Sequence, residues 1–178
     1  MPQAVTHFLV PAIIVNLFRD FFVRDKRNFP LHLVLIGGLA GILPDLDFVA
    51  YYILGFFGYS LSDVHRTLSH TIWLPIILII LGIILHSSKN NFLGKHHLKI
   101  KNVLFIISFG ILTHIFLDGL VEGFVKPFYP FVKSGIGFNF VNMIPEHIQA
   151  TFAASLDAAM LILWIVYIEL KHKISSFI

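Results

Sequence analysis

Long apolar runs separated by short polar segments dominate this chain and predict helices that cross a membrane. Each run is close to the roughly 20 residues that a helix needs to cross the hydrocarbon core of a bilayer. Five spans are predicted, over about residues 4–23, 31–57, 68–85, 102–125 and 151–170. The fold class is therefore an all-α, polytopic transmembrane helix bundle, with residues 1–178 forming a single integral membrane domain.

The second apolar run contains a break at Pro44–Asp47. Proline lacks a backbone N–H and clashes with the preceding helical turn. Asp45 and Asp47 could not share one face of a regular helix, because residues two apart point in nearly opposite directions. A broken helix would let both carboxylates turn toward one buried polar site. The alternative is a short loop between two soluble helices, in which the aspartates cap the second helix.

Composition supports the membrane interpretation. The chain is 57% hydrophobic and 13% charged, with a mean hydropathy of +0.83, whereas soluble domains carry about 25% charged residues. It has no cysteine, which excludes disulfides, thiolate metal ligands and a thiol nucleophile. The net charge is only +3 and the basic residues are scattered among loops, so nucleic acid is not an expected partner. The first run lacks a basic segment before it and is expected to be a membrane span, not a signal peptide.

The distribution of basic residues predicts an orientation in the cell membrane, with the lipid bilayer as partner. Most of them fall on one side of the predicted spans: Arg24, Lys26, Arg27, Lys89, Lys95, Lys99, Lys101, Lys171 and Lys173. Only Arg66, Lys126 and Lys133 fall on the other side. Lysine and arginine are enriched in cytoplasmic loops. The N-terminus is therefore expected outside the cell and the C-terminus in the cytoplasm.

Ionisable residues inside the predicted spans are the candidate functional residues, because a charge at that depth is costly and usually has a partner. With this topology, Asp157 of the fifth span and the candidate residues from the first four spans and the loop before the third fall in the outer third of the membrane or just above it. The candidates other than Asp157 are His7, Asp45, Asp47, His65, His70, His114 and Asp118. Scattered structural polar residues would not be expected to converge at one depth.

Two short motifs indicate the chemistry. His114 and Asp118 are four residues apart on one helical face, where they could bind one divalent cation or act as a ligand and its orienting partner. An interhelical hydrogen bond is the alternative. Glu122, one turn on, could join them. In the segment from His65 to His70, Arg66 suits an anionic substrate, or else its side chain extends to lipid headgroups.

Read in order, these residues resemble a known family. The series comprises Thr6-His7, Leu43-Pro44-Asp45-Leu46-Asp47, His65-Arg66-Thr67-Leu68-Ser69-His70 and Thr113-His114-Ile115-Phe116-Leu117-Asp118. It is similar to the bacterial and archaeal membrane-bound metal-dependent hydrolases, the YdjM-like group that includes LexA-regulated members. The resemblance implies metal ligands at His7, Asp45, Asp47, His65, His70, His114 and Asp118. The chain departs from the family pattern at Val64, where many members have glycine, and at 120–123, where a Thr-Pro pair is missing.

The expected function is a membrane-embedded metal-dependent hydrolase acting on a phosphoester or lipid-like substrate at the extracytoplasmic face. Histidine and carboxylate ligands without sulfur suit one or two Zn²⁺ ions, with Mn²⁺ or Fe²⁺ also compatible. Asp47 or Glu122 would be the general base and Arg66 would hold the anionic transition state. Asp157 is expected either to bind metal or to neutralise a cationic group. The rival functions are an ion or proton-coupled transporter and a non-catalytic membrane scaffold. The oligomeric state is left open.

Overall fold

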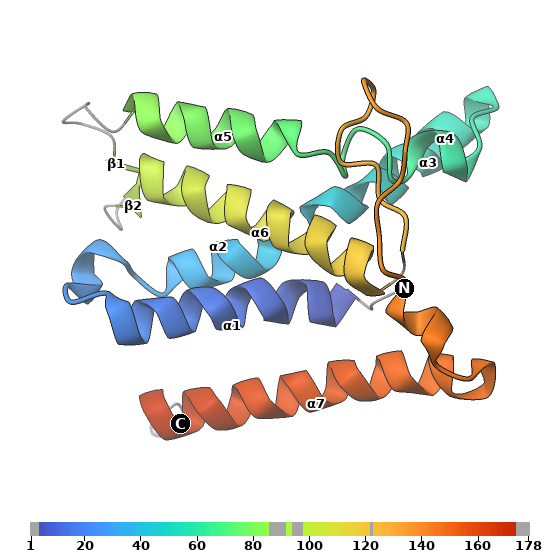
Figure 1. Cartoon of the computed structure of the whole chain (residues 1–178). Coiled ribbons are helices and arrows are strands. Elements are labelled where there is room, and N and C mark those ends of the chain that lie inside the picture. Colours follow the sequence, from blue (N-terminus) through green and yellow to red (C-terminus); the bar gives the residue numbers. More distant parts are fainter. Residues whose placement is uncertain (1–3, 86–91, 94–97, 122, 174–178) are drawn as a thin grey trace.

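The computed structural model describes residues 4–85, 92–93, 98–121 and 123–173, and these residues form a helical bundle (Figure 1). Its α-helices are α1 (Ala4–Phe22), α2 (His32–Ala40), α3 (Asp47–Leu54), α4 (Leu61–Val64), α5 (Trp73–Ile84), α6 (Ile100–Val121) and α7 (Glu146–His172). The 3₁₀ turns are η1 (Lys26–Asn28), η2 (Leu43–Leu46), η3 (Gly55–Phe57) and η5 (Phe140–Met143). Two short strands, β1 (Phe92–Leu93) and β2 (Leu98–Lys99), pair in antiparallel fashion before α6.

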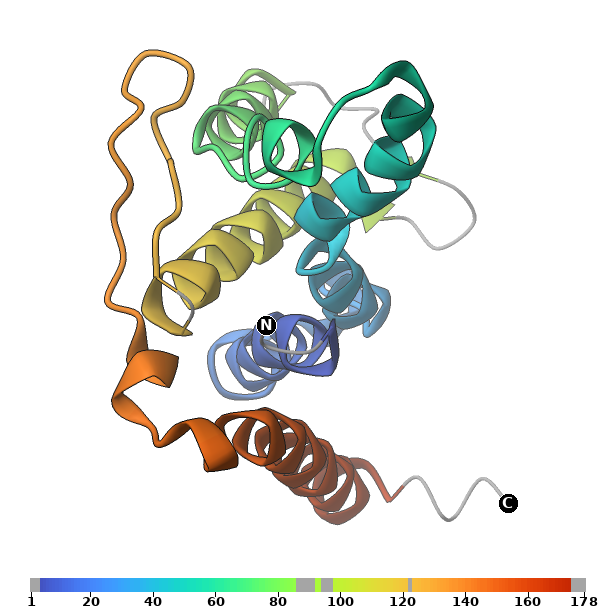
Figure 2. The same cartoon turned by 90° about the vertical axis from the view of Figure 1, so that its right-hand side faces the viewer.

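Helix α6 is central in the bundle. It packs against α5 on one side and against α2 and α1 on the other, and α7 lies beyond α1 (Figures 1 and 2). The connection after α6 runs along one side of the bundle before it reaches α7 (Figure 2). A backbone bridge pairs Val125 with Ile136, and the Ile72 N–H donates to the Pro127 carbonyl. This connection therefore rests against the start of α5.

The all-α polytopic class is confirmed, but the prediction of five spans is too high. Among the described residues, three helices, α1, α6 and α7, are long and apolar enough to cross a bilayer. The helical segments 32–40 and 43–57, which meet at a bend of 54°, make a fourth span if they are counted as one. Helix α5 has only 12 residues. It is therefore about 18 Å long at 1.5 Å per residue, whereas the hydrocarbon core is about 30 Å thick.

Helix α5 begins late because residues 65–72 form a loop and not the first turns of a span. Arg66 has a left-handed backbone with φ of 59°, which a continuous right-handed helix does not allow. The hydroxyl groups of Thr67 and Thr71 donate to the carbonyls of Val64 and Leu68. These local hydrogen bonds replace helical ones, and the loop that they hold carries candidate site residues.

The break in the second apolar run is confirmed. Helix α2 ends at Ala40, η2 places Pro44 in its first turn, and α3 starts at Asp47. Proline suits a first turn because its missing N–H would have no helical partner there. The bend turns Asp45 toward the interior of the bundle, as the sequence predicts.

Two glycines let the helices approach closely at this break. A Cβ atom at Gly41 would collide with the backbone carbonyl of His7, and one at Gly110 would lie 2.5 Å from the Cβ of Ala40. Contacts this short are essentially never made by real side chains. The bare backbones at these positions therefore bring α1, α2 and α6 together beneath the candidate site, as small residues do in membrane helix packing.

The short helix α4 is fixed by a capping box outside the long helices. The backbone N–H and the hydroxyl group of Ser60 both donate to the carboxylate of Asp63, at 2.9 Å and 2.5 Å. These hydrogen bonds hold the pKa of the exposed Asp63 below its usual value. The arrangement stabilises the turn that leads from α3 into the loop at residues 65–72.

Candidate metal centre

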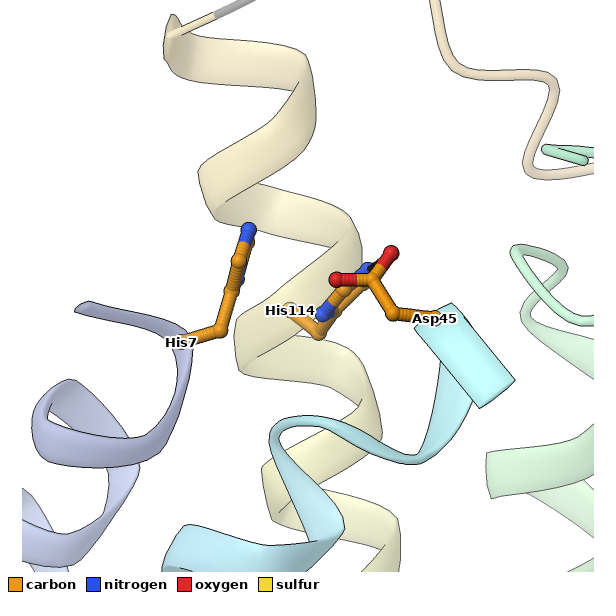
Figure 3. Close-up of side chains that lie close together, drawn as sticks. All are labelled: His7, Asp45 and His114. Carbon is orange, nitrogen blue, oxygen red and sulfur yellow. Dashed lines mark ion pairs between the residues drawn. The ribbon is translucent and has the colours of Figure 1, made fainter. Parts of the chain in front are cut away.

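Four segments that are far apart in the sequence bring their ionisable side chains to one place. Helix α1 supplies His7, η2 supplies Asp45, the loop before α5 supplies His65, Arg66 and His70, and α6 supplies His114 and Asp118. Asp47, at the start of α3, contacts the same loop. All the predicted site residues therefore gather here except Glu122, which lies outside the described residues. Figure 3 shows the approach of His7, Asp45 and His114 from three different elements.

Four ligand atoms form the centre of the cluster. The Nε2 atoms of His70 and His114 are 3.0 Å apart, and the Oδ2 atom of Asp118 lies 3.4 Å from the first and 3.7 Å from the second. The Oδ1 atom of Asp45 lies 3.7 Å from His70 Nε2 and 3.6 Å from His114 Nε2. A tetrahedral Zn²⁺ shell with bonds of 2.0–2.1 Å has ligand atoms about 3.3–3.4 Å apart. These five separations, of 3.0–3.7 Å, are therefore close to those of a single coordination shell.

The second ring nitrogens of the two central histidines set their tautomers. His114 Nδ1 lies 2.7 Å from the Gly41 carbonyl, which can only accept, so the Nδ1 atom carries the hydrogen. Ser69 donates to Asp47 at 2.6 Å, and its oxygen, 2.9 Å from His70 Nδ1, is then free to accept from that nitrogen. Both neutral rings thus direct Nε2 lone pairs at each other. Such an arrangement requires a proton or a metal cation between them.

Burial makes this requirement stronger. His7, His70, His114 and Asp118 are at most 2% exposed. The side chain of Asp45 is 24% exposed and is the most accessible of the central four. Buried ionic groups are stable only when they are paired or coordinated. The cluster is therefore closed on the side of α6 and accessible on the side of Asp45. A catalytic metal site needs such an accessible side, because one coordination position must stay open to water or substrate.

Asp47 faces the loop more than the centre. Its Oδ1 atom lies 2.9 Å from His65 Nδ1, and its Oδ2 atom accepts from the Ser69 hydroxyl and, at 3.2 Å, from the Arg66 N–H. Three groups of described residues have ligand atoms close enough to share one ion: His7, Asp45 and His114; Asp45, His65 and His70; and His70, His114 and Asp118. Asp47 belongs to none of these three. This geometry favours a supporting role, and its predicted ligation stays a prediction.

His7 and His65 flank the centre with buried ring nitrogens. His7 Nε2 lies 3.2 Å from Asp118 Oδ1, and its ring is 4.1 Å from that of His114. Among the described residues, neither His7 Nδ1 nor His65 Nε2 has a hydrogen-bond partner. A buried nitrogen without a partner is costly. Both atoms are therefore available to a second ion, a substrate or a proton.

Arg66 brings a positive charge to the rim of the cluster. Its Nε atom lies 3.3 Å from Asp118 Oδ2, and its side chain is 24% exposed. The left-handed backbone at Arg66 is unusual for a residue with a side chain. The hydrogen bond from its N–H to Asp47 helps to hold this conformation. The guanidinium is thus fixed beside the centre and still reaches solvent or a ligand.

The comparison with known families agrees with this architecture. The sequence model of the YdjM inner membrane protein family matches residues 1–174. The chain belongs to this family. No curated protein and no solved structure matches it. Membership of the YdjM family and the apolar helices together describe a multi-pass protein of the cell membrane.

Asp157, whose role the sequence left open, has a different partner in this YdjM family protein. It comes from α7 and accepts from the backbone N–H of Thr6 at 3.0 Å and from the Thr6 hydroxyl. Thr6 lies in the first turn of α1, where backbone N–H groups lack helical partners. Asp157 therefore caps α1 one residue before His7 and helps to position that histidine.

Sequence reasoning missed two supporting groups, Ser69 and the Gly41 carbonyl. Ser69 sits directly before His70, and a small polar residue next to a candidate ligand is a weak signal for a hydrogen-bond relay. The Gly41 carbonyl is available because α2 ends at Ala40 and η2 begins at Leu43. The sequence predicts the break but does not show which carbonyl it releases toward His114.

Proposed function

We propose that this YdjM family protein is a membrane-embedded, metal-dependent hydrolase in which Asp45, His70, His114 and Asp118 hold a divalent cation. The approach of both carboxylates, at 3.4–3.7 Å, to a pair of imidazole Nε2 atoms 3.0 Å apart supports this proposal most strongly. The sulfur-free set of two imidazoles and two carboxylates suits Zn²⁺, with Mn²⁺ and Fe²⁺ as alternatives. His7 and His65 offer further nitrogens should a second ion bind.

In the proposed reaction the protein supplies orientation and proton transfer. A divalent cation, when bound, lowers the pKa of water and polarises a phosphoryl or carbonyl oxygen. His65 accepts the proton of the attacking water through Nε2, since its Nδ1 is held by Asp47. The same proton then passes to the oxygen of the departing alcohol. The proposed general base is thus the Asp47–His65 pair, in place of the single carboxylate, Asp47 or Glu122, that the sequence led us to expect.

The substrate is proposed to be an anionic amphiphile, such as a lipid phosphoester. The Arg66 guanidinium lies at the rim, where its planar set of donors matches phosphate oxygens. Asp45 marks the accessible side of the cluster. Because the site is surrounded by apolar helices, a substrate with a lipid tail could reach it from the bilayer. The basic loop between α1 and α2 is proposed to face the cytoplasm, which puts the site near the extracytoplasmic surface.

An activity assay in proteoliposomes tests the proposed function. Lipid phosphoesters with different headgroups are incubated with the reconstituted protein, and products are detected by mass spectrometry. Hydrolysis is expected with added Zn²⁺ or Mn²⁺, with loss of activity in Asp45→Asn and retention in Asp63→Asn, which alters an exposed carboxylate in α4. Equal activity in both variants would refute the proposed site. Cation or proton flux without hydrolysis would favour the rival transporter.

A further inference from the structure

An apolar cavity of about 210 Å³ is lined by residues of α1, α2 and α7. Ala12 and Asn16 of α1, Val34 and Leu35 of α2, and Trp164 and Ile168 of α7 are among the residues that line it. On both α1 and α7 the lining residues are spaced four apart over eight residues, a length of about 12 Å along the helix. The cavity is therefore a slot parallel to the helices.

Polar contacts hold α1 and α7 together at the two ends of this slot. At one end Asp157 accepts from Thr6. At the other end the fully buried carboxylate of Asp20 accepts from the Tyr167 hydroxyl at 2.9 Å and lies 3.0 Å from His172 Nε2. The two helices run in the same direction and are fixed at both ends. The space between them is thus a built feature of the bundle, and not the result of a loosely attached helix.

Two buried polar atoms on the slot residues have no hydrogen-bond partner among the described residues. They are Asn16 Oδ1 and Trp164 Nε1, and Asn16 as a whole is only 1% exposed. One is an acceptor and the other a donor. Buried polar atoms normally find partners. A ligand that suits this slot therefore has a long apolar part together with hydrogen-bond donors and acceptors.

The end of the slot near Asp20 is basic. Arg19 and Lys26 lie 3.0 Å and 3.6 Å from Asp20, and the side chain of Lys26 is 45% exposed. Lys171 of α7 lies near the end of α1, because its Nζ atom is 5.5 Å from the centre of the Phe21 ring. Within residues 19–27 and 169–173, six lysine and arginine residues outnumber three carboxylates. Basic residues at a membrane surface attract anionic lipid headgroups.

We infer that the slot binds one acyl chain of an anionic phospholipid, with the headgroup at the basic end beside Lys26 and Lys171. Phosphatidylglycerol has the required chemistry, because its ester carbonyls accept hydrogen bonds and its headgroup hydroxyls donate them. The lipid is a resident component that fills the space between α7 and the rest of the bundle. The basic end of the slot lies at the opposite end of α1 from His7, and the inference does not depend on the proposed hydrolase activity.

Fluorescence quenching by brominated lipid tests this inference, because the chain has only two tryptophans, Trp73 and Trp164. In a Trp73→Phe protein, Trp164 reports on the slot directly. Phosphatidylglycerol with brominated chains is titrated into phosphatidylcholine bilayers. Quenching is expected to saturate at a low mole fraction of the brominated lipid. Brominated phosphatidylcholine should quench only in proportion to its abundance.

Two α2 variants provide a matched pair. Leu35 lines the slot and Leu39 does not, and both are 52% exposed. Leu35→Phe is expected to raise the half-saturating mole fraction about tenfold by crowding the slot, whereas Leu39→Phe leaves it unchanged. Identical curves for the two variants, or for the two lipids, would overturn the inference. Native mass spectrometry of the unaltered chain gives a second test: one retained phosphatidylglycerol supports the site, and retention of no lipid contradicts it.

Discussion

At the scale of single residues, hydrogen bonds outside the centre of the cluster determine which ring nitrogen of each histidine faces that centre. The Gly41 carbonyl fixes His114, and Ser69 fixes His70, so that both Nε2 atoms face Asp118. Asp47 fixes His65 through Nδ1 and leaves its Nε2 atom without a partner among the described residues. Partners of this kind orient metal ligands and raise their basicity. The cluster thus contains two kinds of side chain: those that point toward the common centre, and those that orient them by hydrogen bonds.

The division of roles predicts the behaviour of an Asp47→Asn variant. If Asp47 orients His65 without binding metal, the variant retains its metal and loses about 10²–10⁴-fold in turnover, the usual contribution of general acid–base catalysis. Metal content and hydrolysis are measured on the same preparation, with Asp45→Asn as the comparison. Loss of metal from Asp47→Asn to the same extent as from Asp45→Asn would show that Asp47 is a ligand after all.

The sequence alone identifies the residues of the cluster but not their division into ligands and supports. His7, Asp45 and His114 are recognisable because ionisable side chains are costly inside apolar helices. The role of Asp47 could not be predicted, because it depends on the left-handed backbone at Arg66, which turns the loop back toward α3. The sequence does not predict this conformation, because arginine rarely adopts a left-handed backbone.

At the scale of the elements, the site depends on one broken helix and one shortened helix. The break between α2 and α3 is predictable from Pro44, because proline has strong local effects. The late start of α5 is not, because residues 68–72 are as compatible with a span as with a loop. The close contact of α2 with α6 at Gly110 holds the broken end of α2 against His114. Packing at this glycine therefore supports the candidate metal centre.

Substitution of Gly110 by alanine tests whether close packing at this position outweighs the higher helix propensity of alanine. Alanine is normally favoured over glycine in a helix by about 1 kcal/mol. At Gly110, however, the added Cβ atom would lie 2.5 Å from Ala40, and overpacking costs about 1–3 kcal/mol. Thermal unfolding in detergent should therefore show a lower melting temperature for Gly110→Ala.

Gly55→Ala is the matched control, because the nearest neighbour of its added Cβ atom is 3.8 Å away. This variant should melt at the wild-type temperature or slightly above it. If Gly110→Ala is as stable as Gly55→Ala, the contact between α2 and α6 leaves room for a Cβ atom at residue 110, which would contradict this role.

At the scale of the whole molecule, the cluster and the basic segments lie at opposite ends of the bundle. His7 is near the start of α1, and Lys26 follows its end. The parallel helices α1 and α7 span between the two ends (Figure 1). A membrane protein with this charge asymmetry is expected to keep its basic end in the cytoplasm. The site would then face the extracytoplasmic side.

Cysteine labelling in intact cells tests this orientation, and the chain is suited to it because it has no cysteine of its own. Ser62→Cys places an exposed thiol on α4, near the site, and Lys26→Cys places one at the basic end. A membrane-impermeant maleimide is expected to label the first variant from outside and the second only after lysis. The reverse pattern would place the site on the cytoplasmic side.

Metal analysis of the purified protein is the decisive experiment for the proposed binding of a divalent cation by Asp45, His70, His114 and Asp118. Protein purified without chelators is passed through gel filtration, so that only folded material is analysed by inductively coupled plasma mass spectrometry. We expect at least one equivalent of Zn²⁺, Mn²⁺ or Fe²⁺ per chain in the wild type and in the control Asp63→Ala/His147→Ala, and none in Asp45→Ala/His114→Ala. The absence of bound metal from the wild type, or equal metal in the two double variants, would contradict the proposed binding.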